Sequence, residues 1–350
     1  MLLIAAALLL LLALVKPTMT LPRDTWDFMF VLDITGSMNV ADAGSGDANV
    51  TRLDFARQLA GKALEEMRCG SRAGLAVFTE HRSFLLFAPI EVCDNHLVIS
   101  TMLQRIDWRM AWAERSEVAK GLYSGIEAVQ ALEVMDEAGR AGDTRLVFMT
   151  DGHEAPPVHP ALRPKFRGRA GITEGLVAGI GGSTPAPIPW FDENGEAAGY
   201  WARDEVMQVD RHSLGRPSTQ GEAMAGVDSA DLQERIASGT EHLSSLRESY
   251  LRQLAAETGL EYVRATTGET FSRALLDTRF ATKRPVLTNV AWIPATLSLL
   301  CVLYLFTTRL HSRIRRLHPR FTAERARAGS WRRADSPRGD AAPRPHVRRR

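Results

Sequence analysis

The chain has 350 residues, which is enough for one large domain or two ordinary ones. Its 45% hydrophobic and 24% charged residues are typical of a globular protein and exclude a wholly disordered or fibrous chain. The net charge of +2 is unevenly distributed along the chain. Residues 309–350 contain 14 Arg and three acidic residues and carry a charge of +11, so the remaining residues carry −9. A mildly acidic body with a strongly basic tail indicates separate compartments or separate partners for the two parts.

Residues 1–15 form the first apolar run. It has about the length of a signal-peptide core and is short for a membrane span, which needs roughly 20 residues. It lacks a basic segment before it and a small-x-small cleavage site before Lys16. A cleaved signal peptide and a retained N-terminal anchor therefore both stay open.

The body that follows alternates between strand and helix patterns. In chain order we expect a strand (28–32), a helix (54–67), two strands (72–78, 83–88), two helices (97–106, 118–135), two strands (145–149, 174–180), a helix (244–258), a strand (261–264) and a helix (270–276). Strands separated by helices predict an α/β fold. We expect a doubly wound, mostly parallel sheet with helices on both faces, over residues 24–280.

Residues 184–238 interrupt this alternation and are predicted to be an insertion. It opens with a β-hairpin that turns at Asn194-Gly195, a strong hairpin signal. Residues 211–229 within it are polar and expected to be mobile.

The second apolar run, 290–308, is near the spanning length and predicts a transmembrane helix. Five Arg follow it between 309 and 320, so the positive-inside rule places the tail, 309–350, in the cytoplasm. We expect this basic tail to be disordered from Thr322 on. The body then lies outside the inner membrane, in the periplasm. A buried core helix is the alternative for 290–308, but it leaves the basic tail unexplained.

Oxygen-bearing side chains follow the first strand at alternate positions: Asp33, Thr35 and Ser37. In open α/β sheets, ligands bind at the carboxyl ends of strands. One carboxylate and two hydroxyls, without a nearby Cys or His, suit a hard divalent cation such as Mg²⁺. A helix N-cap is the alternative for this segment taken alone.

Two further loops should meet the first at the same edge of the sheet. Ser116 lies just before the 118–135 helix, and Asp151 follows the 145–149 strand. A doubly wound sheet would gather both with the first loop, and we expect Asp151 to be a solvated carboxylate on its rim. Its replacement by Ala should then weaken metal binding with little loss of folding.

The three segments together resemble a von Willebrand factor A (VWA) domain with a metal-ion-dependent adhesion site (MIDAS). The family pattern is Asp-x-Ser-x-Ser, then a Thr, then Asp-Gly; here Thr35 replaces the first Ser and Ser116 the Thr. The resemblance implies that Thr35, Ser37 and Ser116 ligate Mg²⁺ (or Mn²⁺ or Ca²⁺) directly. Asp33 and Asp151 would act through water. One position would stay open for an acidic group of a protein partner.

The segments GLVAGIGGSTPAPIPWFDENGEAAGYW and SYLRQLAAETGLEYVRAT are similar to those of membrane-anchored bacterial VWA proteins. These are the Bat aerotolerance type and the accessory proteins of methanol-oxidation clusters (Mxa type). The resemblance implies a non-enzymatic accessory factor in the assembly or maturation of an envelope or periplasmic enzyme complex. Other VWA proteins and a MoxR-type AAA+ ATPase would be its partners.

Two other functions are weighed against this one. A metal-dependent hydrolase needs a general base beside the metal, and only His153 and Glu154 are near in sequence. Those two residues could also shape a partner-facing rim, but a plain surface loop is favoured for them. A surface adhesin is the second alternative, which the cytoplasmic tail disfavours. The position of the Arg tail after a span favours lipid or protein contacts over nucleic acid.

Three cysteines are present. Cys301 lies in the predicted span. Cys69 and Cys93 lie in the body, in what we take to be an oxidising compartment, where they form either a disulfide or two free thiols.

Overall fold

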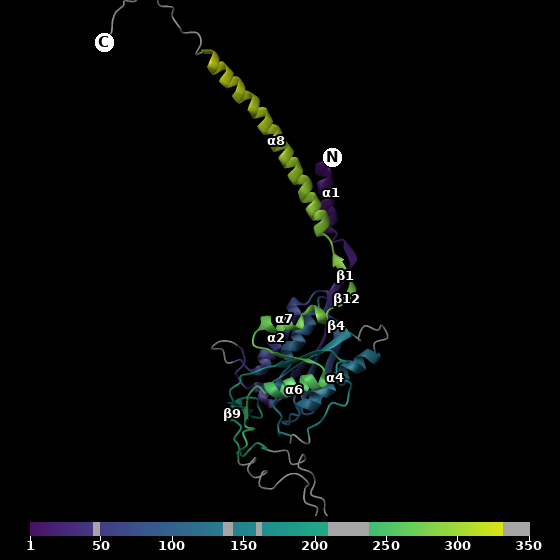
Figure 1. Ribbon diagram of the computed structural model, residues 1–350, viewed down its shortest axis with the longest axis vertical. Coiled ribbons are helices and arrows are strands. Elements are labelled where there is room, and N and C mark those ends of the chain that lie inside the picture. Colours follow the sequence, from purple (N-terminus) through teal and green to yellow (C-terminus); the bar gives the residue numbers. More distant parts are fainter. Residues whose placement is uncertain (45–49, 136–142, 159–162, 209–237, 332–350) are drawn as a thin grey trace, which may run out of the picture. The chain divides into compact units, whose positions relative to one another are not determined.

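The computed structural model describes residues 1–44, 50–135, 143–158, 163–208 and 238–331. It divides into two compact units (Figure 1). One is the body, residues 21–286, and the other joins the N-terminal residues 1–20 to the segment that starts at Leu287. The predicted mobile segment 211–229 lies outside the described residues.

The body is built on a six-stranded sheet whose strands follow the order β11-β6-β5-β2-β3-β4. All neighbours pair in parallel except β3 and β4. The predicted doubly wound, mostly parallel sheet is therefore confirmed. The strands are β2 (Asp27–Asp33), β3 (Arg72–Thr79), β4 (Arg82–Glu91), β5 (Thr144–Thr150), β6 (Gly175–Gly179) and β11 (Glu261–Arg264).

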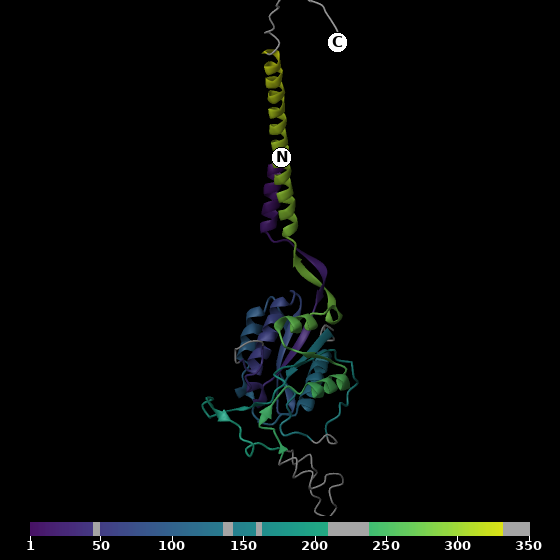
Figure 2. The same cartoon turned by 60° about the vertical axis from the view of Figure 1, so that its left-hand side comes forward.

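Helices cover both faces of this sheet, as Figure 2 shows. On one face α2 (Arg52–Glu66), α3 (His96–Arg105) and α7 (Gly268–Leu275) share a core with Phe28, Phe30 and Leu32 of β2. On the other, α4 (Val118–Met135) and α6 (Glu248–Thr258) pack with Met29 and Val31. Every residue of β2 is buried because its side chains alternate between two covered faces.

The predicted hairpin is present in the insertion. Strands β8 (Pro189–Phe191) and β9 (Ala197–Tyr200) pair antiparallel, and the N–H of Gly195 donates to the carbonyl of Asp192 at 2.9 Å. The predicted helix over 244–258 begins later, at Glu248. Residues Leu243–Ser244 form instead a short strand, β10, which pairs with β7 (Ala186–Pro187).

A two-stranded ribbon of β1 (Thr18–Thr25) and β12 (Thr282–Asn289) was not predicted. Both strands carry charged residues and a proline, and few of their side chains are buried, so no hydrophobic period marks them. Within the body, Arg284 of β12 donates to Asp27 of β2 at 2.6 Å and to Asp143 at 2.8 Å.

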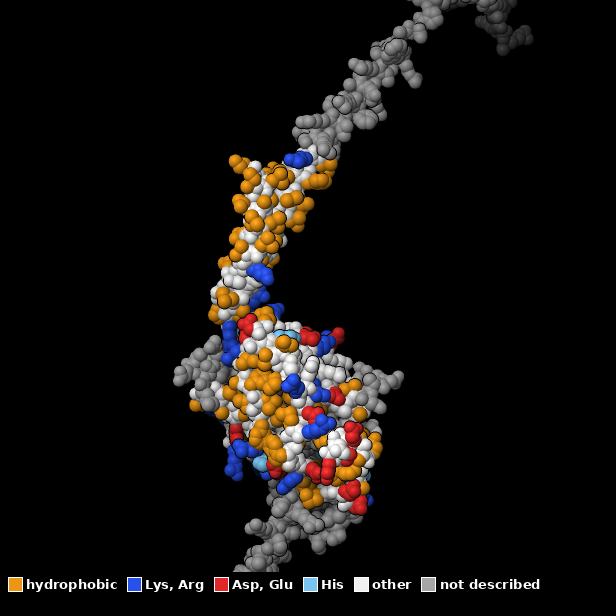
Figure 3. All heavy atoms as spheres, turned by 180° about the vertical axis from the view of Figure 1, so that it is seen from behind, with side chains coloured by type: hydrophobic (Ala, Val, Ile, Leu, Met, Phe, Trp, Pro, Cys, Tyr) orange, Lys and Arg blue, Asp and Glu red, His pale blue; other side chains and the backbone are white. Residues whose placement is uncertain are grey.

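The second unit pairs α1 (Leu2–Leu14) with α8 (Trp292–Trp331). The Ser298 hydroxyl donates to the Ala6 carbonyl at 2.9 Å, and both residues are buried. Other side chains on α8, among them Leu300 and Phe306, are exposed and apolar. Figure 3 shows hydrophobic side chains gathered along this helical unit. Among the described residues, one stretch is long and apolar enough to cross a membrane, Trp292–His311 within α8.

Helix α8 extends beyond the predicted span of 290–308 and ends at Trp331. The expectation of disorder from Thr322 is therefore not met over the first part of the tail. Residues 309–331 contain seven Arg and three Ala, residue types that favour helix, so a helix already nucleated in the span can continue into them. Residues 332–350 lie outside the described chain.

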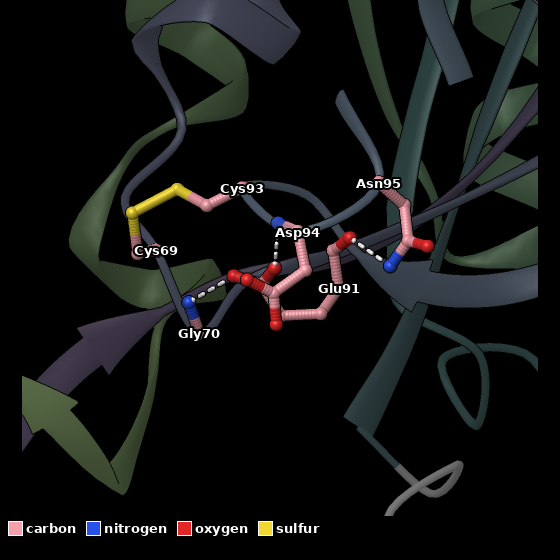
Figure 4. Close-up of a disulfide and its surroundings, with 6 residues drawn as sticks. All are labelled: Cys69, Gly70, Glu91, Cys93, Asp94 and Asn95. Atoms are coloured by element: carbon pink, nitrogen blue, oxygen red, sulfur yellow. Dashed lines mark hydrogen bonds between the residues drawn. A yellow bond between two sulfur atoms is a disulfide. The ribbon is translucent and has the colours of Figure 1, made fainter. Parts of the chain in front are cut away.

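A disulfide joins Cys69, after α2, to Cys93, after β4, with 5.2 Å between the two Cα atoms (Figure 4). The Glu91 carboxylate accepts the backbone N–H groups of Gly70, at 2.7 Å, and Asp94, at 2.6 Å. The bridge lies where β3 starts, at the opposite edge of the sheet from the carboxyl end of β2. Cys301 is a free thiol.

Candidate metal centre

Asp33, the last residue of β2, organises the first of the three loops. Its Oδ1 accepts the backbone N–H of Thr35 at 2.9 Å and the Thr35 hydroxyl at 2.7 Å. Its Oδ2 accepts the hydroxyl of Thr150, at the end of β5, at 2.6 Å. The carboxylate is completely buried and ties together the ends of two adjacent parallel strands.

Thr35 and Ser37 follow on a 3-10 turn, η1 (Gly36–Asn39). Their hydroxyl oxygens lie 3.5 Å apart, and both side chains are buried. Thr35 occupies the N-cap of η1, but its side chain makes no capping hydrogen bond. The helix-cap alternative therefore does not account for these hydroxyls.

Ser116 is held by its backbone from two sides. Its N–H donates to the Ala155 carbonyl at 2.7 Å, and the Ala155 N–H donates to the Ser116 carbonyl at 2.9 Å. A parallel β-bridge joins Ser116 to Glu80 on the other side. Its hydroxyl is buried and has no hydrogen-bond partner among the described residues. A buried hydroxyl without a partner costs about 1–3 kcal/mol, so the Ser116 hydroxyl is a group that a bound cation would satisfy.

Asp151 is also completely buried, so the predicted solvated rim carboxylate was wrong. Its Oδ1 accepts the N–H of His153 at 2.9 Å. Its Oδ2 accepts the Arg52 guanidinium at 2.5 Å and the Ser244 hydroxyl at 3.0 Å. Sequence alone missed this burial because both Oδ2 partners are distant along the chain.

Arg52 is a residue of the candidate site that sequence reasoning did not identify. It follows the N-cap Thr51 at the start of α2, and its side chain is fully buried. Besides Asp151, it donates to both carboxylate oxygens of Asp42, at 2.8 and 2.7 Å. It packs so closely against Gly181 that a Cβ there would lie 2.6 Å from its Nε. No local pattern distinguishes this arginine from a surface residue at the start of a helix.

The carboxylates of Asp33 and Asp151 differ in whether a positively charged side chain lies next to them. Burial would raise the pKa of Asp151, but the neighbouring Arg52 guanidinium holds it below the ordinary value. Burial and the negative charge of Asp151 raise the pKa of Asp33 to about 7, against the hydrogen bonds from Thr150 and Thr35. Asp33 thus faces an anion and lacks a cation of its own among the described residues.

This arrangement suits a divalent metal ion. All five predicted residues, Asp33, Thr35, Ser37, Ser116 and Asp151, are buried at one edge of the sheet. The donors are oxygens only, which Mg²⁺, Mn²⁺ and Ca²⁺ prefer. The unpartnered Ser116 hydroxyl and the incompletely compensated carboxylates are the two features that a cation would satisfy.

Neither His153 nor Glu154 is an exposed rim residue, although His153 lines a cavity beside the candidate metal centre and Glu154 does not. The Glu154 carboxylate accepts the N–H of Ala119 at 3.1 Å, at the start of α4, and the hydroxyl of Tyr250. The His153 ring is buried 3.6 Å from Glu241, and burial lowers its pKa to about 4.

Comparisons with known proteins return distant similarities. No family model matches the sequence. A UPF0353 protein of Mycolicibacterium paratuberculosis is 29% identical over 159 residues, which cover 44% of this chain. The chain spans 43% of the length of that relative.

Among solved structures, the chain is similar to an aerotolerance-related membrane protein of Bacteroides fragilis. The identity is 16%, the TM-score is 0.45, and the match covers 71% of this chain and 96% of the other. The PilB minor pilin of Streptococcus sanguinis matches with 15% identity and a TM-score of 0.35, over 72% and 60% of the two chains. An uncharacterized membrane spanning protein of Vibrio fischeri matches with 16% identity and a TM-score of 0.26, over 71% and 96%.

The candidate metal centre opens on a cavity of about 690 Å³. Thr35, Ser37 and Ser116 line it together with His153. The three hydroxyl-bearing residues therefore reach a space that a ligand from outside can enter.

Proposed function

We propose that this protein is a membrane-anchored binding module that holds a protein partner through a divalent metal ion, and that it is not an enzyme. One observation carries the proposal. The Ser116 hydroxyl, which is buried and has no hydrogen-bond partner among the described residues, borders the same cavity as Thr35 and Ser37. Two buried carboxylates, Asp33 and Asp151, lie beside these hydroxyls, and of the two only Asp151 contacts Arg52.

Thr35, Ser37 and Ser116 would hold the metal through their hydroxyl oxygens, and Asp33 and Asp151 through water. A bound Mg²⁺, or Mn²⁺ or Ca²⁺, supplies a positive charge that can accept a carboxylate oxygen. Because the cavity leads to these residues, an acidic side chain of a partner could approach the metal from that side.

Binding is favoured over catalysis by the contacts of Glu154. Its carboxylate is engaged by the start of α4 and by Tyr250, so it is not available as a general base. A metal-dependent hydrolase would need such a base in reach of a water molecule.

We further propose that α8 anchors the protein in the inner membrane, with the body in the periplasm and the basic tail in the cytoplasm. The Arg residues that follow the span support this orientation. The Cys69–Cys93 disulfide is in keeping with an oxidising compartment. The role would be assembly or maturation of an envelope complex, of Bat-like or methanol-oxidation-like type. Other VWA proteins and a MoxR-type ATPase are its proposed partners.

The test is affinity capture with the full chain from solubilised membranes, without cross-linking, in Mg²⁺ and in EDTA. Proteins captured by wild type in Mg²⁺ should be lost in EDTA and with Ser116→Ala. Ser272→Ala is the matched control, because Ser272 in α7 is equally buried and its hydroxyl has no partner among the described residues. A captured set that is the same under all these conditions would contradict the proposal.

A further inference from the structure

The cavity beside the metal centre has aromatic walls. Four of the seven tryptophans of the chain line it, together with one phenylalanine. These residues are Trp108, Trp112, Trp190, Phe191 and Trp201. Tryptophan is the residue type most enriched at the energetic centres of protein interfaces, so this concentration points to recognition of a partner.

Two separate segments build these walls and hold each other in place. One is the connection between α3 and α4, which contains a 3-10 turn, η2 (Trp108–Met110); the other is the β8–β9 hairpin. The rings of Trp108 and Phe191 stack across the two segments with centroids 4.4 Å apart. Trp190 and Trp201 contact edge to face at 6.4 Å. The walls are therefore formed before any ligand arrives, which lowers the entropic cost of binding.

Buried polar groups without a hydrogen bond among the described residues line the cavity. They are the Ser116 hydroxyl and both ring nitrogens of His153, whose Nε2 lies 3.6 Å from a carboxylate oxygen of Glu241. The Ser116 and His153 side chains are each 1% exposed. Such groups are rarely left unpaired in a native protein, so a ligand with polar atoms near the metal centre would satisfy them.

The mouth of the cavity indicates how large the ligand is. Trp112 is 56% exposed, Trp190 41% and Met207 53%, although all three line the cavity. A small molecule enclosed by the cavity would leave these apolar surfaces in water. A polypeptide that continues past the mouth would cover them.

The charges around the cavity restrict that polypeptide further. Glu114, Glu205 and Glu241 line it, against a single arginine, Arg115. A strongly acidic segment would be repelled by these glutamates, whereas one carboxylate directed at the metal would not. The ligand is thus expected to carry one acidic residue among apolar neighbours.

We propose that the cavity binds a segment of a partner polypeptide in which a single Asp or Glu lies near a large apolar side chain, aromatic by preference. The acidic group would reach the metal centre, and the apolar side chain would pack against the tryptophans. Both side chains would enter together because Ser37, Ser116 and the aromatic walls border one space. The inference rests on the proposed metal-dependent function.

The test is a selection from a random heptapeptide display library on the full chain in detergent micelles with Mg²⁺, followed by elution with EDTA. The enriched peptides should pair one acidic residue with a nearby aromatic or large aliphatic one. Trp190→Ala should weaken binding of a selected peptide about thirtyfold, as expected for truncation of an interface hot spot. Tyr200→Ala is the matched control, because Tyr200 lies on the same hairpin, is 64% exposed and does not line the cavity.

The outcomes separate this inference from the proposed function. Enrichment of acidic peptides without any apolar preference, or an equal loss from Trp190→Ala and Tyr200→Ala, would overturn the inference and leave the metal-dependent function standing. Enrichment of basic peptides would overturn it as well, because the glutamates and tryptophans would then act as a cation site. The absence of any EDTA-eluted peptide, together with unchanged capture of proteins in EDTA, would count against the proposed function itself.

Discussion

Arg52 places a permanent positive charge inside the candidate metal centre. Its guanidinium is fully buried and is shared between Asp42 and Asp151, with Ser244 as a further acceptor. Removal of one partner from a buried ion pair is strongly destabilising, because it leaves an uncompensated charge in a region of low dielectric constant. The orientation of Asp151 toward the metal loop should depend on this arginine.

Replacement of Arg52 by methionine should lower the free energy of unfolding by about 3–5 kcal/mol. The measurement is urea unfolding of the full chain in detergent, followed by tryptophan fluorescence in metal-free buffer. Lys62→Met on the same helix is the control and should change the free energy by less than about 0.5 kcal/mol, because Lys62 is 43% exposed. Equal effects of the two substitutions would show that the Arg52 cluster contributes no more than a surface charge.

Sequence reasoning located the three loops of the candidate metal centre but not the residues that hold them. Asp33, Thr35 and Ser37 were predictable because they directly follow a buried strand in a recognisable pattern. Arg52 and Ser244 were not, because they lie 99 and 93 residues away from Asp151 along the chain. Burial of Asp151 depends on these distant contacts, which no local pattern encodes.

At the scale of elements, the disulfide joins two segments that the sheet already places side by side. Cys69 precedes β3 and Cys93 follows β4, and these two strands pair antiparallel. The bridge closes a loop with a sequence separation of 24 residues. Closure of a loop of this size stabilises the folded state by about 3 kcal/mol, chiefly by restricting the unfolded chain.

The double substitution Cys69→Ser and Cys93→Ser should therefore cost about 3 kcal/mol in urea unfolding under oxidising conditions. Mg²⁺ binding should be unchanged, because the bridge and the metal centre lie at opposite edges of the sheet. Cys301→Ser, which removes the free thiol of α8, should leave stability unaltered. A loss of metal binding in the double variant would mean that the two edges are coupled.

The sequence predicted best those helices and strands whose apolar residues recur at a regular helix or strand spacing. The sheet strands β2, β3, β5, β6 and β11, and helices α2 and α4, agree with their predicted ranges to within about two residues. The β1–β12 ribbon and the short strands β7 and β10 were missed, because pairing between distant segments defines them, not a hydrophobic pattern of their own. The Asn194-Gly195 hairpin was found because its turn chemistry is local.

For the molecule as a whole, we expect metal binding to raise the free energy of unfolding. A ligand that binds the folded state alone stabilises it by about 2.7 kcal/mol at a concentration one hundred times its Kd. For a body of this size that corresponds to a rise in Tm of about 5–10 °C. Differential scanning fluorimetry of the full chain in detergent should show this rise on replacing EDTA with Mg²⁺.

Asp33→Asn should abolish the Mg²⁺-dependent rise in Tm, whatever its effect on the Tm in EDTA. The asparagine keeps the shape of the side chain and its contact to Thr35 but removes the charge that faces Asp151. A wild-type Tm that stays the same from EDTA to saturating Mg²⁺ would speak against a metal site at this edge.

The β1–β12 ribbon also sets an order of events during synthesis. The Thr25 hydroxyl donates to the carbonyl of Thr282, a residue 257 positions further along the chain. The first strand to leave the ribosome must therefore wait, unpaired, until nearly the whole body has been made. Any nascent chain released early would expose β1 as an open strand edge, a known starting point for aggregation. Among the described strands, only pairing with β12 covers this edge of β1.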